Sequence, residues 1–176
     1  FAVYPSVWSY FGKAQFGWSP AMIGGSLALF GAAMAVVQGG LIRPVLHRFA
    51  ERGTVLIGFA CSITTFGLIA TVTWGSAILI LTPLAALAGV IPPALQALMS
   101  ARVTPERQGA LQGLLTSASA LAMVVAPLVM TSVFAAFTSA STPVYFAGAP
   151  FVLSMILSVV ALVLFRRVRI NPAHVD

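Results

Sequence analysis

Residues Leu81 to Gly113 read LTPLAALAGVIPPALQALMSARVTPERQGALQG, and this stretch decides the fold. It holds an apolar run of helix length, a short positive turn and the start of a second apolar run. Two long hydrophobic segments joined by a short positive loop are typical of a hairpin across a membrane. Pro92-Pro93 interrupts the first segment, because proline lacks the backbone N–H and crowds the carbonyl four residues earlier.

The composition places the whole chain in lipid. Of its 176 residues, 60% are hydrophobic and 7% are charged, with a mean hydropathy of +1.03, whereas a soluble domain carries about 25% charged residues. The net charge of +6 does not indicate a nucleic-acid partner, since the basic residues are spread over loops and the tail rather than gathered on one face. Cys61 stands alone in an apolar run, so neither a disulfide framework nor a metal site is expected.

Six apolar segments follow one another, and they run about 1–12, 20–42, 54–74, 77–100, 108–138 and 144–165. A helix needs about 20 residues to span the hydrocarbon core, and the last five segments are long enough. The first segment reaches only about 18 Å, so we expect its helix to begin upstream of Phe1. The predicted fold is therefore an all-α integral membrane bundle over 1–170, six helices with the first truncated, followed by a tail at 171–176.

The charged residues predict the orientation in the membrane. Positive clusters recur at every second loop: Arg43, Arg48, Glu51 and Arg52, then Arg102, Glu106 and Arg107, then Arg166, Arg167 and Arg169. This is the positive-inside pattern, so we expect these loops and the C-terminus to be cytoplasmic. The arginines serve either orientation alone or, for some of them, a gating role.

The middle of every predicted span is free of charged side chains and histidines. This argues against an intramembrane protease, a metal site or a proton wire made by this chain alone, because charges in lipid are kept only for function. The polar side chains that remain in the spans are uncharged amides and hydroxyls, and one aromatic residue is added to them as a candidate. The candidates for a substrate path are Gln38, Gln96, Gln112, Ser62, Thr65, Ser117 and Trp8. The alternative is that these side chains only bond neighbouring helices.

Broken helices supply the candidates for a gate. Freed carbonyls at membrane depth are tolerated only inside protein or beside a water-filled cavity, so Pro92 and Pro93, next to Gly89, form either a packing kink or a working hinge. The six segments can be split into two triplets, as in transporters built from inverted repeats. Pro5 then occupies the position in segment one that Pro93 occupies in segment four, which adds Pro5 to the hinge candidates.

Several motifs resemble one transporter family. Pro93-Ala94-Leu95-Gln96-Ala97 with Ser100, followed by Gln108-Gly109-Ala110-Leu111-Gln112-Gly113, resembles the helix 10 to helix 11 signature of tetracycline-type drug:proton antiporters of the major facilitator superfamily. The 43–53 loop, RPVLHRFAERG, resembles the second-half loop motif of that superfamily. The similarity covers the chain as helices 7 to 12 of a twelve-helix transporter. Arg43 and Ala50 stand where the family usually has glycine, and Ser62 stands where tetracycline exporters carry an acidic residue.

The resemblance implies a secondary transporter of the bacterial inner membrane that exports a drug or small metabolite by proton antiport. It implies no cofactor, and its partners would be the substrate, protons, the lipid bilayer and an amino-terminal six-helix half. The coupling carboxylate would lie in that other half, since Glu51, Glu106 and Asp176 are all in predicted cytoplasmic segments. The alternatives are an uptake symporter, a non-transporting helical subunit and a membrane-embedded enzyme, for which no nucleophile or ligand set is found.

Overall fold

The computed structural model describes residues 3–139, 142 and 144–168, and in this part of the chain all regular structure is helical. The principal helices are α1 (Val3–Phe16), α2 (Pro20–Val36), α3 (Ile42–Thr71), α4 (Gly75–Ala86), α5 (Ile91–Ser100), α6 (Gln108–Thr138) and α7 (Ala149–Arg167). Three short segments of other helical type are η1 (Val37–Leu41), η2 (Leu87–Val90) and η3 (Pro105–Arg107). The predicted tail at 171–176 lies outside the described residues.

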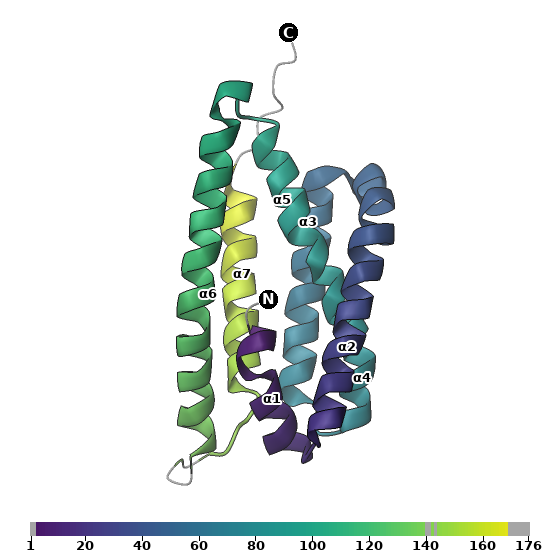
Figure 1. Ribbon diagram of the computed structural model, residues 1–176, viewed down its shortest axis with the longest axis vertical. Helices are drawn as coiled ribbons and strands as arrows, with labels where there is room; N and C mark the ends of the chain where they lie inside the picture. The colour runs from purple at the N-terminus through teal and green to yellow at the C-terminus, as the bar shows by residue number, and fades with distance from the viewer. Residues whose placement is uncertain (1–2, 140–141, 143, 169–176) are drawn as a thin grey trace.

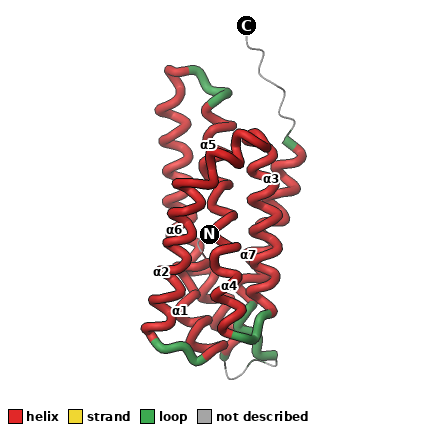
Figure 2. The backbone as a smooth tube through the Cα atoms, turned by 90° about the vertical axis from the view of Figure 1, so that its right-hand side faces the viewer, coloured by secondary structure: helices red, strands yellow, loops and turns green. Residues whose placement is uncertain are grey.

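The helices run side by side and antiparallel, with the connections at the two ends of the bundle (Figures 1 and 2). By length and hydropathy, four helical stretches can cross a membrane: Pro20–Thr71, Gly75–Ser100, Pro105–Thr138 and Ala149–Arg167. The predicted all-α membrane class is confirmed. The count of six helices stays a prediction, because α1 is too short for this criterion and α2, η1 and α3 form one helical stretch with a turn inside it.

That first stretch reverses direction inside the 43–53 loop (Figure 1). Ala50 has φ 54° and ψ 177° and is the one described non-glycine residue with a positive φ, so the two arms of the chain fold back on each other there. The Thr54 hydroxyl donates to the Ala50 carbonyl at 2.7 Å and so holds the turn. The alanine therefore adopts a backbone conformation that glycine occupies with less strain.

The helix ends follow local signals. Ser19 caps α2 by accepting a hydrogen bond from the Met22 backbone N–H, with Pro20 at the first helical position. The predicted fourth span, 77–100, is not one regular helix: α4 tightens into the 3₁₀ segment η2, which ends at Val90, two residues before Pro92. The proline pair then lies in the first turn of α5, where the missing N–H groups need no helical partner.

The core is aromatic and joins the two ends of the chain. Phe151 at the start of α7 is fully buried, and its ring centroid lies 4.8 Å from that of Phe11 and 6.1 Å from that of Trp8, both on α1. Phe66 of α3 completes the contact at 6.5 Å from Phe151. Since lipid tails are as apolar as these side chains, close packing rather than exclusion of water stabilises such a cluster.

By contrast, nearly all side chains of α6 are exposed or only partly buried. Met130 is its only buried side chain. The side chains of Leu114, Leu121, Met123 and Leu128 are all more than half exposed. In a membrane protein, such a face is covered by lipid or by another protein surface.

Candidate substrate path and gate

Two irregular helical turns pack against each other. The π-helical turn η1 interrupts the stretch that starts with α2, and the 3₁₀ turn η2 interrupts the span formed by α4 and α5. The two turns are in contact, with Val37, Ala86 and Val90 buried between them. Sequence reasoning found the second break through its prolines but missed the first, for which Gly39-Gly40 was the available signal. Turns of π type are frequent at functional sites.

Gly89 lies at the centre of this contact. A methyl group added at Gly89 would come within 2.8 Å of the Met34 Sδ atom and 3.9 Å of the Gln38 Nε2 atom. The absence of a side chain at Gly89 therefore lets η2 approach Met34 and Gln38 closely. A second close approach lies on α3, where a methyl group at Gly58 would collide with Ile91 and meet the Val90 Cγ2 atom at 3.1 Å.

Of the predicted path residues, three carry amides and all three are exposed. Gln96 on α5 donates from Nε2 to the Gln112 Oε1 atom on α6 at 3.3 Å. Gln38, on η1, adjoins Gly89, while Gln96 and Gln112 pair between α5 and α6; these three exposed amides are named the amide strip.

The other candidates divide between surface and core. Ser117 is exposed on α6, whereas Ser62, Thr65 and Trp8 are buried, so the latter three do not share the exposed strip. The Trp8 indole N–H donates to the Ser26 hydroxyl at 2.8 Å, which ties α1 to α2. The Ser62 and Ser158 hydroxyl oxygens lie 3.3 Å apart and join α3 to α7. The Thr65 hydroxyl is buried without a partner in the described part of the chain.

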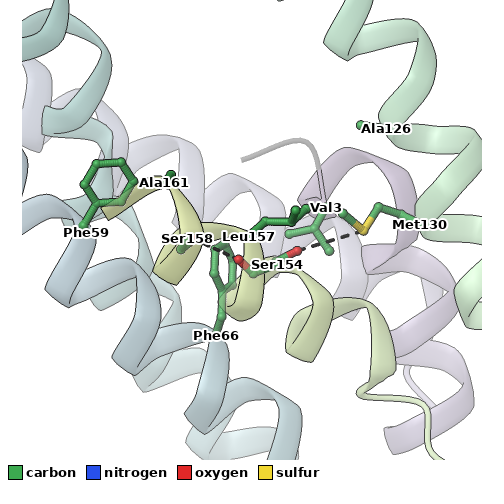
Figure 3. Close-up of a pocket in the computed structure, with 9 residues that line it drawn as sticks. All are labelled: Val3, Phe59, Phe66, Ala126, Met130, Ser154, Leu157, Ser158 and Ala161. Atoms are coloured by element: carbon green, nitrogen blue, oxygen red, sulfur yellow. Dashed lines mark hydrogen bonds between the residues drawn. The ribbon is translucent and has the colours of Figure 1, made fainter. Parts of the chain in front are cut away.

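A pocket of 260 Å³ opens between α3, α6 and α7 (Figure 3). Its walls are mainly apolar, with Phe59, Phe66 and Met130 among them. The lining hydroxyls of Ser154 and Ser158 are already bonded, since they donate to the carbonyls of Pro150 and Ser154 at 2.9 and 2.8 Å. The pocket thus offers a shape but few free polar groups.

The proline hinge candidates lie at the starts of two helices, α1 and α5. Pro5 is exposed in the described first turn of α1, while Pro92 is exposed and Pro93 half-buried at the start of α5. The loop-motif residues Arg43, Arg48 and Glu51 are exposed at the end of the bundle where α2 meets α3 (Figure 1). Arg52 differs, because its guanidinium lies over the Phe165 ring of α7 at 6.0 Å from the centroid. Their roles stay predictions.

Comparison with known proteins supplies the context for this geometry. The family model described as Major Facilitator Superfamily matches residues 1–175. The tetracycline resistance protein of class G from Vibrio anguillarum is 37% identical over 92% of this chain and 40% of its own length. The class C protein from Escherichia coli is 38% identical over 78% and 34%, and the class E protein from the same species is 34% identical over 92% and 38%. The chain thus spans well under half the length of these relatives. No solved structure matches it significantly.

Proposed function

The chain belongs to the Major Facilitator Superfamily, and from this premise we propose that it forms the carboxy-terminal half of a proton-coupled drug exporter of the bacterial inner membrane. The relatives it matches are named for tetracycline resistance, which supports a tetracycline-like substrate. The activity is transport rather than chemistry, so no catalytic residue and no cofactor are assigned. The ends that carry Arg48, Arg107 and Arg167 face the cytoplasm, because arginine-rich ends stay inside.

The strip of exposed amides carries this proposal. Gln38, Gln96 and Gln112 each present a donor and an acceptor but no charge, which suits a drug rich in oxygen and nitrogen atoms. Gln112 lies on the exposed face of α6 beside Gln96, and in the complete transporter this face is covered by the amino-terminal half. The substrate path then runs between the two halves, with one wall formed by this strip.

The contact of η1 with η2 is the gate in this proposal. Both turns depart from regular α-helix within stretches that are long and apolar enough to cross a membrane, and π-helical turns are frequent at functional sites. A small change in either turn would tilt α5 against α2. Gly89 allows this motion, because it keeps side-chain bulk out of the contact.

An efflux assay tests the proposal. The complete transporter is expressed in drug-sensitive bacteria, and tetracycline accumulation is followed with and without a proton uncoupler. We expect lower accumulation that the uncoupler abolishes. Higher accumulation would favour the uptake symporter, and unchanged accumulation at normal expression would favour a non-transporting subunit.

A matched pair of variants tests the strip itself. The double variant Gln96→Leu, Gln112→Leu removes two amides from the wall, and we expect a rise in KM of roughly two- to tenfold per lost substrate hydrogen bond. Gln15→Leu removes an amide at the end of α1, away from the strip, and should leave KM unchanged. Equal kinetics for the two proteins would refute the assignment of this wall.

A further inference from the structure

A second groove lies outside the amide strip, at the arginine-bearing end of the bundle. It has a volume of 370 Å³ and is lined by residues from the end of α5, the start of α6 and the end of α7. Its apolar lining includes Leu95, Leu98, Met99, Val103, Leu111 and Phe165. The remaining lining residues are Val168 and a single charged side chain, Arg102.

The charged side chains that line this groove or flank it on α7 are positive, and the exposed carboxylate of Glu106, in η3, lies outside the lining. Arg102 is exposed at its mouth, and Val168 brings the last turn of α7, with exposed Arg166 and Arg167, to the same opening. No carboxylate lines the groove, and none of these arginines forms an ion pair with a described residue. Arg52 adds a further positive charge behind the wall, over the ring of Phe165.

An apolar groove that ends at unpaired guanidinium groups, at the level where the helices end, fits an amphipathic anion. We propose that this groove is a binding site for one anionic phospholipid, with an acyl chain along the apolar walls and the phosphate on Arg102, flanked by Arg166 and Arg167. Guanidinium groups bind phosphate oxygens through paired N–H donors. Basic pockets between transmembrane helices are a known way to hold acidic headgroups.

The apolar walls and the arginines have different effects on lipid binding, so the site should prefer one class of headgroup. The acyl chain gains no hydrophobic free energy in the groove, since the surrounding lipid is equally apolar. The walls therefore determine where the lipid lies, and the arginines determine which headgroup is preferred. An arginine near an acidic headgroup contributes about 1 kcal/mol, which corresponds to roughly a fivefold change in binding. This proposal does not depend on the transported substrate.

Photolabelling of the complete protein tests it. The probes are phosphatidylglycerol and phosphatidylcholine that carry a diazirine in one acyl chain, each added to phosphatidylcholine vesicles, and the labelled peptides are identified by mass spectrometry. We expect peptides of α5, α6 and α7 that contain Leu98, Leu111 and Phe165 to be labelled severalfold more by phosphatidylglycerol. Equal labelling by the two probes would overturn the proposal.

Two variants and one control separate the site from surface charge. Arg102→Gln should lower the phosphatidylglycerol labelling of the groove about fivefold, while Arg48→Gln, which removes one charge at the same end but outside the groove, should not. Leu111→Trp keeps every charge and fills the groove, so it should lower labelling by both probes there. If Arg48→Gln lowers the labelling as much as Arg102→Gln, or if Leu111→Trp leaves it unchanged, the discrete site does not exist. Labelling at other helices serves as the check that each variant is folded.

Discussion

Replacement of Ala50 by glycine should stabilise the protein. With φ 54° and ψ 177°, Ala50 occupies a region of backbone space that is essentially reserved for glycine, and such a residue costs of order 1–3 kcal/mol. Its side chain is exposed, so little packing is lost on its removal. The Thr54 hydroxyl bonds the Ala50 carbonyl, which remains in the variant.

The expected gain is smaller than the strain. Glycine gives the unfolded chain more freedom, which costs about 0.5–1 kcal/mol. The difference leaves a net stabilisation of about 1 kcal/mol, or a rise in Tm of roughly 2–4 °C for a chain of this size. Thermal unfolding in detergent, followed by tryptophan fluorescence, measures this change because Trp8 is buried in the core.

Ala60→Gly is the matched control. Ala60 is also exposed and belongs to the same helix, but its backbone is regular, so glycine there should lower stability by about 0.5–1 kcal/mol. The two substitutions are chemically identical and have opposite expected signs. If Ala50→Gly lowers Tm as Ala60→Gly does, the positive φ at Ala50 is not a source of strain.

Three further predictions follow from the packing and from the proposed function. Gly58→Ala should destabilise by about 1–3 kcal/mol, because its methyl group collides with Ile91, and a Tm equal to that of the unaltered protein would show that α3 and α5 are less tightly packed. The double variant Pro92→Ala, Pro93→Ala should reach the membrane in normal amounts but lose turnover, whereas unchanged transport at equal expression would reduce the proline pair to a packing feature. Glu51→Gln and Glu106→Gln should leave drug-induced proton release intact, since the coupling carboxylate is expected in the amino-terminal half; loss of coupling in either variant would place it in this chain.

The all-α membrane class could be predicted from the sequence because hydropathy and the positions of prolines are local signals. The bounds of α6 match the segment predicted for it, since Pro105 and the apolar run define both ends. The π turn η1 could not be predicted, because its glycines are equally typical of a surface for close helix packing. Nor could the sequence separate Trp8, Ser62 and Thr65 from Gln96 and Gln112, because burial depends on which face of each helix meets its neighbours, and that is set by partners distant in sequence.

The meeting of Phe151 with Phe11 and Trp8 has a consequence for biosynthesis. The aromatic core is built from the first described helix and the last, and α3, from the middle of the chain, packs extensively along α7. The four long apolar stretches can enter the bilayer on hydropathy alone as they emerge from the ribosome, but the core has no complete partner set until residue 151 has been made. Until then the face of α1 that packs on Phe151 is uncovered. A nonsense codon before α7 should therefore destabilise the remaining helices of this bundle rather than leave a shortened but stable one.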